Sequence, residues 1–253
     1  MISIVLPSYN GEKYIRQSID SIITQTYHDW ELIIINDCST DNTGIIAEEY
    51  AQKDCRIKVI HNKINKKLPT SLNVGFEEAK GEFFTWTSDD NVYKKNALDR
   101  LLSPFLESTD VDLVFSDYTI IDMDDYILFD VKAGPLEDIY FKDVIGASFL
   151  YKREVHFGVN GFDSNKFLVE DYDFWLKAKR KYKFYYLNEI LYYYRIHRSS
   201  LTAKRKQEVE KSTIELLAEN IKYIPEKSLN IRKKVEEKIE IYYKTNKKDM
   251  RQL

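Results

Sequence analysis

Cysteine is scarce in this sequence, which contains only Cys38 and Cys55. Two cysteines supply neither a disulfide framework nor a cluster of metal-binding thiolates. The chain also lacks a strong excess of basic residues, since its formal net charge at pH 7 is −3. A general nucleic-acid binder would carry such an excess, so we expect no nucleic-acid partner.

Long apolar runs are absent as well. No uninterrupted apolar stretch approaches the roughly 20 residues that a helix needs to cross a bilayer. The N-terminus begins at once with a strand-like segment, residues 2–6, and lacks the basic region and apolar stretch of a signal peptide. Together with the low cysteine count, these absences predict a cytoplasmic protein that is soluble, or at most peripheral to the inner face of a membrane.

Glycine-rich nucleotide-binding motifs are missing too. A dehydrogenase would carry a G-x-G-x-x-G fingerprint and a P-loop protein a G-x-x-x-x-G-K-[ST] loop, and the sequence has neither. A sugar-1-phosphate nucleotidyltransferase, which shares the general α/β design and uses a metal, would need a glycine-rich basic loop near the first strand. Residues 8–12 do not form such a loop. These three enzyme classes are therefore disfavoured.

What the sequence does contain is an alternation of apolar strands and amphipathic helices in its first half. The apolar pattern predicts strands at 2–6, 32–35, 57–60 and 83–86. It also predicts three helices: one at about 12–25, one that begins after a cap within residues 37–41 and runs to residue 50, and one at about 70–80. Continuous apolar strands with helical crossovers indicate a mostly parallel sheet covered on both faces. Ligands of such sheets bind outside the C-terminal ends of the strands, so we expect the ends of strands one, two and four to line one crevice.

The second half is more mixed and ends in a basic tail. Its pattern predicts strands at 113–115 and 190–194 and a helix near 172–180. Residues 204–253 hold 14 Lys and Arg against 9 Asp and Glu, a net of +5. Two amphipathic helices are expected there, and Pro225 ends the first of them. We therefore divide the chain into a domain of residues 1–203 and a helical C-terminal extension of residues 204–253.

Two adjacent carboxylates, Asp89 and Asp90, follow the apolar strand at 83–86. Charges at the end of a buried strand need either water or a cation, and hard ions such as Mg²⁺ and Mn²⁺ prefer carboxylate oxygens and often share a site with substrate phosphates. Acidic residues after a strand also form turns and helix N-caps. The pair alone leaves both interpretations open.

Other polar residues stand at strand and helix ends that the fold would bring to the same crevice. Tyr9, in the turn after the first strand, can stack on a nucleobase or simply pack. Asp37 ends the second strand and can accept the imide N–H of a uracil or thymine ring, or cap a helix. Asp171 begins a helix, where it can act as a general base or as a structural acid that the helix N-terminus favours.

The order of these motifs resembles that of family 2 of the inverting nucleotide-sugar glycosyltransferases, which have the GT-A fold. The resemblance covers roughly residues 2–202 and implies an α/β protein with a Rossmann-like, mixed but mostly parallel sheet. It is carried by residues 4–10, 25–27, 30–41, 73–75, 79–82, 89–90, 170–171 and 194–200. Each segment is modest by itself, but their order is specific.

The resemblance implies roles for individual residues toward a nucleotide-sugar donor. It implies a nucleobase pocket that Pro7, Tyr9 and Asp37 line. It also implies that Asp89 faces the ribose or the diphosphate and that Asp90 binds Mn²⁺ or Mg²⁺. A departing nucleoside diphosphate accumulates negative charge, which such a metal stabilises.

The same resemblance implies the catalytic chemistry. Asp171 would take the proton from the acceptor hydroxyl, while Arg195 and His197 would approach the diphosphate, His197 also as a metal ligand. Two positions depart from the family pattern. Thr87 stands where many relatives have an acid, and Lys67 stands where glycine is usual. Metal binding would therefore depend on Asp90 and His197.

The expected function is transfer of a sugar, from a UDP-sugar in preference to a dTDP- or GDP-sugar, to a growing surface polysaccharide or a glycolipid. The alternative is a non-catalytic nucleotide-sugar-binding module or an inactive subunit of a larger synthase, which the missing acid at Thr87 keeps open. The basic tail could contact anionic lipid headgroups, because each basic residue near such a surface gains about 1 kcal/mol. Alternatively, its helices pack on the catalytic domain.

Overall fold

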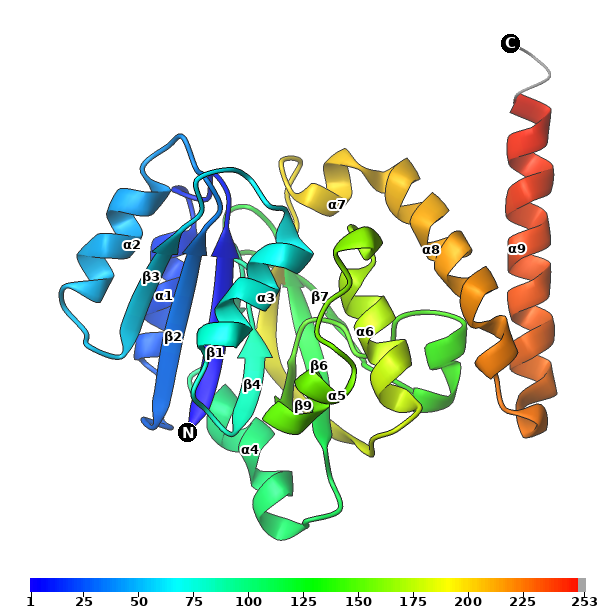
Figure 1. The fold of residues 1–253 in the computed structure, drawn as a ribbon, viewed down its shortest axis with the longest axis horizontal. Coiled ribbons are helices and arrows are strands. Elements are labelled where there is room, and N and C mark those ends of the chain that lie inside the picture. Colours follow the sequence, from blue (N-terminus) through cyan, green and yellow to red (C-terminus); the bar gives the residue numbers. More distant parts are fainter. Residues whose placement is uncertain (250–253) are drawn as a thin grey trace.

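The computed structural model describes residues 1–249, so the last four residues of the expected C-terminal extension, 250–253, lie outside the described part. A mixed sheet runs through the molecule in the order β3-β2-β1-β4-β8-β6-β9-β5, and β7 pairs with β6. Helices lie on both sides of this sheet (Figure 1). The α/β architecture predicted from the strand and helix alternation is confirmed.

The strands and helices have the following bounds. The strands are β1 Ile2–Ser8, β2 Trp30–Asn36, β3 Ile57–His61, β4 Phe83–Trp86, β5 Val92–Tyr93, β6 Leu113–Ile121, β7 Ile127–Val131, β8 Phe149–Lys152 and β9 Phe184–Arg195. The α-helices are α1 Ile15–Ile23, α2 Thr43–Ala51, α3 Leu68–Glu78, α4 Ala97–Glu107, α5 Arg153–Gly158, α6 Glu170–Lys179, α7 Leu201–Lys204, α8 Lys206–Asn220 and α9 Leu229–Asp249. Short 3₁₀ turns are η1 Leu136–Tyr140, η2 Ser164–Lys166, η3 Ile221–Tyr223 and η4 Glu226–Ser228.

The N-terminal half of the sheet is parallel, because β1 pairs in parallel with β2 and β4, and β2 with β3. The last residues of β1 and β2, Ser8 and Asn36, are level in this register. Successive side chains of a strand point to opposite faces, and in β1 both faces are covered: Ile4 packs into one apolar core and Val5 into the other. This double burial explains why the strand sequences are mostly apolar on both faces.

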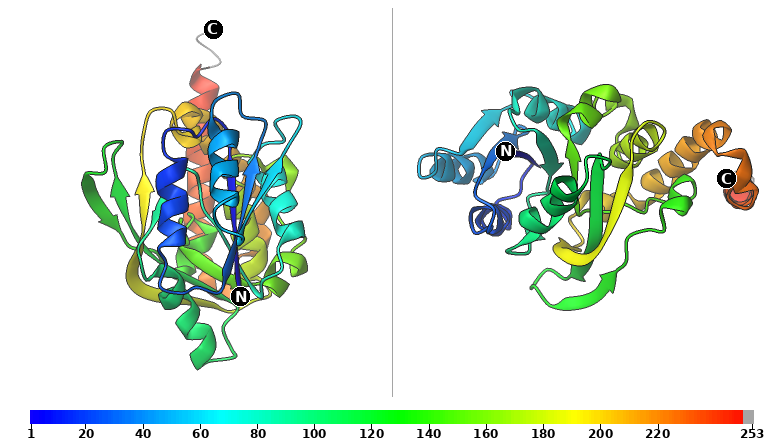
Figure 2. Two further views of the ribbon diagram at one scale, coloured as in Figure 1. Left: turned by 90° about the vertical axis from the view of Figure 1, so that its left-hand side faces the viewer. Right: turned by 90° about the horizontal axis from the view of Figure 1, so that it is seen from below.

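Helices supply the two cores on either side of the sheet. The apolar faces of α1, α2 and α4 pack into one core, and those of α3, α5, α6 and α8 into the other. The right-hand view in Figure 2, seen along the strands, shows α1 and α3 on opposite sides of the first strands. Because helices cover both faces, a ligand reaches the parallel strands most directly at their ends.

The C-terminal half contains longer strands than the sequence pattern predicts. β6 and β9 pair in parallel along most of their length, whereas only residues 113–115 and 190–194 were expected. The apolar pattern in the sequence ends after residue 115 because the next residues of β6 are buried but polar. Ser116 bonds to the hydroxyl of Ser148 at 2.6 Å, and Asp117 accepts the N–H of Ala133 at 2.8 Å. These hydrogen bonds let polar side chains continue a buried strand.

The tail forms two helices that pack against the rest of the chain. Leu216 and Leu217 of α8 and Val235 of α9 are buried in the same core as α6. Figure 1 shows α9 beside α8 at the edge of the molecule. Packing of the tail on the domain, one of the two alternatives, is therefore observed. No helix within residues 1–249 combines the length and the apolarity that crossing a membrane requires.

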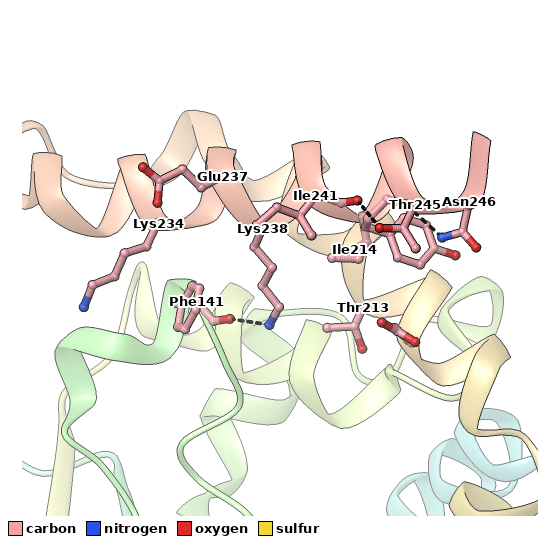
Figure 3. Close-up of a pocket in the computed structure, with 11 residues that line it drawn as sticks. Phe141, Thr213, Ile214, Lys234, Glu237, Lys238, Ile241, Thr245 and Asn246 are labelled. Carbon is pink, nitrogen blue, oxygen red and sulfur yellow. Dashed lines mark hydrogen bonds between the residues drawn. The ribbon is translucent and has the colours of Figure 1, made fainter. Parts of the chain in front are cut away.

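A groove of about 620 Å³ lies between α8, α9 and the loop after η1 (Figure 3). Across it, the Lys238 ammonium donates a hydrogen bond to the Phe141 carbonyl at 3.2 Å. None of the site residues predicted from the sequence lines this groove. The candidate active site lies elsewhere.

Candidate active site

A cleft of about 700 Å³ opens at the C-terminal ends of β1, β2 and β4, as the strand order predicted. Its walls also include residues from the loops before β8 and α6 and from the segment after β9. Seven of the eight predicted site residues line it: Pro7, Tyr9, Asp37, Asp89, Asp90, Asp171 and His197. Residues that lie up to 190 positions apart in the chain thus share one cavity.

Asp89 is held against the end of β1. Its Oδ2 accepts a hydrogen bond from the hydroxyl of Ser8. A Cβ at Gly11 would lie 2.0 Å from the same oxygen, so only glycine leaves room for this carboxylate. Burial, with added repulsion from Asp90, raises the pKa of Asp89 to about 7. The first acid of the pair therefore titrates near neutrality.

The second acid, Asp90, contacts a histidine from the far end of the chain. Its Oδ2 lies 2.9 Å from Nε2 of His197, and Nδ1 of the same ring lies 2.7 Å from the hydroxyl of Ser199. The ring of Tyr14 is 5.4 Å from the imidazole, centroid to centroid. A hydrogen bond to the second ring nitrogen is the usual way in which proteins orient a metal-binding histidine.

The donor set suits a metal that the substrate helps to bind. No group of three or more His, Cys, Asp or Glu side chains within residues 1–246 is arranged to enclose a metal ion. Mg²⁺ sites commonly use one or two carboxylates together with waters and substrate phosphates. Asp90 and His197 fit such an open site. Thr87 cannot contribute, because its side chain is buried and its hydroxyl bonds to that of Tyr192.

Arg195 does not lie in the cleft, although the sequence interpretation directed it to the diphosphate. Its side chain is fully buried, with the guanidinium bonded to the carbonyls of Asp90 and Asp122 at 2.8 and 3.0 Å and to Gln17 at 2.7 Å. It also forms an ion pair with Asp125 at 2.7 Å. The guanidinium thus supports the backbone of Asp90 from behind.

Asp37 lines the cleft and also holds a neighbouring loop in place. Its two carboxylate oxygens accept the side-chain amide of Asn62 at 2.8 Å and the backbone N–H groups of Lys66 and Lys67 at 2.9 and 3.0 Å. These bonds fix the loop between β3 and α3 over the end of β2. Tyr9, in contrast, is 53% exposed at the rim of the cleft. Its ring is free to contact a planar ligand.

Asp171 lies at the start of α6 with a second acid beside it. Burial raises the pKa of Asp171 above its ordinary value, although the backbone N–H of Tyr172 donates to its Oδ1 at 2.7 Å. Glu170 is almost fully buried, and its Oε2 accepts the N–H of Leu168 at 2.7 Å. Burial, followed by repulsion from Asp171, raises the pKa of Glu170 to about 8. The carboxyl of Asp171, in this environment, is suited to act as a general base near neutral pH.

The cleft also contains residues that the sequence interpretation missed. Asp143, in the loop before β8, lines the same cleft, where desolvation, followed by repulsion from Asp171, raises its pKa above the ordinary value. The indole N–H of Trp86 is buried in the structure without a hydrogen-bond partner among the described residues. No local motif marks Asp143, so only the fold could bring it near Asp171.

Comparison with known proteins gives the family. The profile described as Glycosyl transferase family 2 matches residues 3–157. The chain is 31% identical over 222 residues to the uncharacterized glycosyltransferase RP339 of Rickettsia prowazekii, covering 83% of this chain and 68% of that protein. It is 27% identical to the putative teichuronic acid biosynthesis glycosyltransferase TuaG of Bacillus subtilis, covering 84% and 85%. The chain therefore belongs to glycosyltransferase family 2 and is an enzyme of that class.

Solved structures support the fold. TarS of S. aureus, residues 1–349 in complex with UDP-GlcNAc, has a TM-score of 0.68 and 21% identity, covering 87% of this chain and 66% of that one. The mannosyltransferase PcManGT from Pyrobaculum calidifontis, in complex with GDP-Man and Mn²⁺, has a TM-score of 0.68 and 17% identity, covering 87% and 64%. The predicted GT-A fold is confirmed.

Proposed function

We propose that this chain transfers a sugar from a nucleoside diphosphate sugar, preferably a UDP-sugar, to a hydroxyl of a saccharide or glycolipid acceptor, with inversion at the anomeric carbon. The observation that carries the proposal is the convergence of Tyr9, Asp37, Asp89, Asp90 and Asp171 on one cleft. The UDP-GlcNAc that the TarS structure contains supports UDP as the nucleotide. The similarity to TuaG supports a role in polysaccharide biosynthesis.

In the proposed reaction, the carboxylate of Asp171 takes the proton of the acceptor hydroxyl. The acceptor oxygen forms a bond to the anomeric carbon while the bond from that carbon to the diphosphate oxygen breaks, and its electron pair leaves with the nucleoside diphosphate. A single displacement inverts the configuration. Tyr9 stacks on the base and Asp37 accepts its imide N–H, while Asp89 contacts the ribose or the diphosphate.

Asp90 and His197 are the residues that would hold Mn²⁺ or Mg²⁺. Bound there, the ion would stabilise negative charge on the departing diphosphate. The imidazole of His197 is oriented for this role by Ser199, and the backbone of Asp90 by Arg195. The Mn²⁺ in the PcManGT complex supports a divalent metal in this cleft.

A thermal-shift series tests donor binding. UDP, dTDP, GDP and CDP are each added with and without Mn²⁺, since a ligand that binds only the native state raises the melting temperature by mass action. We expect UDP to give the largest shift and to need Mn²⁺ for it. If none of the four nucleotides changes the melting temperature, the proposed function is wrong.

Turnover is tested with Asp171→Asn and with UDP-GlcNAc as the donor, by measuring release of UDP with and without a saccharide acceptor. The variant should bind UDP normally but release it at least about 100-fold more slowly than the wild type, the lower end of the range for loss of a general base. Asp124→Asn, an exposed turn residue, is the matched control. Nucleotide binding without turnover in the wild type would favour the non-catalytic module.

For the tail, we propose that residues 204–253 form an extension of the catalytic domain that also allows peripheral contact with an anionic membrane surface on the cytoplasmic side. Lys side chains of α9, among them Lys233, Lys234 and Lys244, are exposed. Co-sedimentation with phosphatidylglycerol vesicles should fall when Lys233 and Lys234 are both changed to Gln. Equal binding to neutral vesicles would argue against an electrostatic contact.

A further inference from the structure

Lys67, the residue before α3, has a backbone conformation that only glycine adopts easily. Its φ is 66° and its ψ is 164°. A side chain in this region is strained and persists only where the surroundings impose it. Here the surroundings are the carboxylate of Asp37, which accepts the N–H groups of Lys66 and Lys67. Backbone geometry therefore gives no reason for a lysine at this position.

The side chain of Lys67 suggests a reason. Lys67 lines the cleft, and its Nζ lies 5.0 Å from the ring centroid of Phe167, a residue of the loop before α6 that also lines the cleft. No carboxylate within residues 1–246 forms a salt bridge with this ammonium. A cation–π contact leaves the ammonium hydrogens available to an anion.

The cleft contains several acidic side chains, so a cation without a salt-bridge partner matters for the binding of an anion. Arg195, the cation expected at the diphosphate, is buried and bonded elsewhere. Asp89 and Asp90 add negative charge beside the position of the phosphates. A diphosphate entering this cleft therefore needs positive charge from the lysines that line it, in addition to any metal. These are Lys13, Lys67 and Lys204, and Lys67 belongs to the loop that Asp37 anchors.

We propose that Lys67 binds the diphosphate of the donor and so determines the preference of the cleft for nucleoside diphosphates over nucleosides. This inference rests on the proposed function, because the anion that it assigns to Lys67 is part of the nucleotide-sugar donor. The side chain reaches the cleft from the loop that Asp37 anchors, so one loop serves both the base and the phosphates. The backbone strain at Lys67 is retained for the sake of this cation.

The test compares the affinities of UDP and uridine, or of GDP and guanosine if GDP is the preferred nucleotide, by isothermal titration calorimetry with Mn²⁺. In Lys67→Gln, which removes the charge but keeps a polar side chain and the strain, we expect the dissociation constant of the diphosphate to rise about tenfold or more, the usual effect of losing a charge-assisted hydrogen bond. The affinity for the nucleoside should not change. Lys67→Arg should bind the diphosphate nearly as tightly as the wild type.

A second variant separates the role of the charge from that of the fold. Lys67→Gly should lose diphosphate affinity as Lys67→Gln does, yet its melting temperature should rise, because glycine relieves the strain. A purely structural residue would not weaken binding while it relieves strain. Lys66→Gln is the matched control for Lys67→Gln, since the Lys66 side chain is exposed, adjacent and absent from the cleft lining; it should leave diphosphate affinity unchanged.

Several results would overturn the inference. Unchanged diphosphate affinity in Lys67→Gln would show that the ammonium does not contact the phosphates. An equal loss of nucleoside and diphosphate affinity would mean that Lys67 only shapes the base pocket through Asp37. If the wild type binds none of the nucleotides, the proposed function itself fails, and the assignment of Lys67 fails with it.

Discussion

Nε2 of His197 lies 2.9 Å from Oδ2 of Asp90, although 107 positions separate the two residues in the sequence. The contact joins the loop after β4 to the segment after β9. Ser199 bonds to the other ring nitrogen of the histidine, and Arg195 to the carbonyl of Asp90. Both members of the pair are therefore held in place by protein groups before any ligand enters.

We expect Asp90→Asn and His197→Gln each to reduce the Mn²⁺-dependent part of the UDP thermal shift, because each change removes a strong ligand from a site with few protein ligands. The double variant should lose no more of the Mn²⁺-dependent shift than the two single variants lose together, since both residues act on one ion. His28→Gln, an exposed histidine, is the control. A full Mn²⁺-dependent shift in both single variants would contradict the metal site.

Arg195→Met should destabilise the fold by about 1–3 kcal/mol, the usual effect of leaving buried acceptors without their donor. The carbonyls of Asp90 and Asp122 would lose their donor, and Gln17 its partner. Urea unfolding measures this change, with the exposed Arg198→Met as the matched control. If Arg195 instead contacted the diphosphate, the variant would fold normally and bind UDP weakly.

The acid side of the pH–rate profile should reflect the carboxyl cluster of Asp143, Glu170 and Asp171. The active base is the ionised form, and the pKa of Asp171 is raised by burial, so activity should fall at a pH above 3.8, the ordinary pKa of an aspartate. Asp143→Asn removes a negative neighbour and should shift this acid limb of kcat/KM to lower pH. Glu77 is an exposed acid on α3, and Glu77→Gln should not change the pH at which the acid limb of kcat/KM falls.

His156 should make the stability of the fold depend on pH. Burial, with added repulsion from Arg153, lowers its pKa to about 4 from 6.5. The unfolded chain then binds more protons than the native one between these values, so stability is full above pH 6.5 and falls as the pH decreases toward 4, by roughly 3 kcal/mol at most. His156→Phe should flatten this part of the curve in urea unfolding, and His28→Phe should not.

The apolar strands of the first half, with their helical crossovers, could be predicted from local pattern alone. Residues such as Ile4 and Val5 face two different cores, so burial on both sides leaves a continuous apolar signature in the sequence. The crevice at the strand ends follows from the same logic, because parallel strands bring their C-terminal ends to one edge. Seven of the eight predicted site residues accordingly share the cleft.

The position of Arg195 shows where sequence pattern is insufficient. A motif indicates which residue types stand near a site, but the direction of a long side chain depends on the acceptors that surround it, here the carbonyls of Asp90 and Asp122. The nearness of Asp143 to Asp171 and the strain at Lys67 likewise arise from loops brought together by distant strands. Such long-range placements depend on packing between separate elements and leave no periodic trace in the chain, whereas burial within one element does.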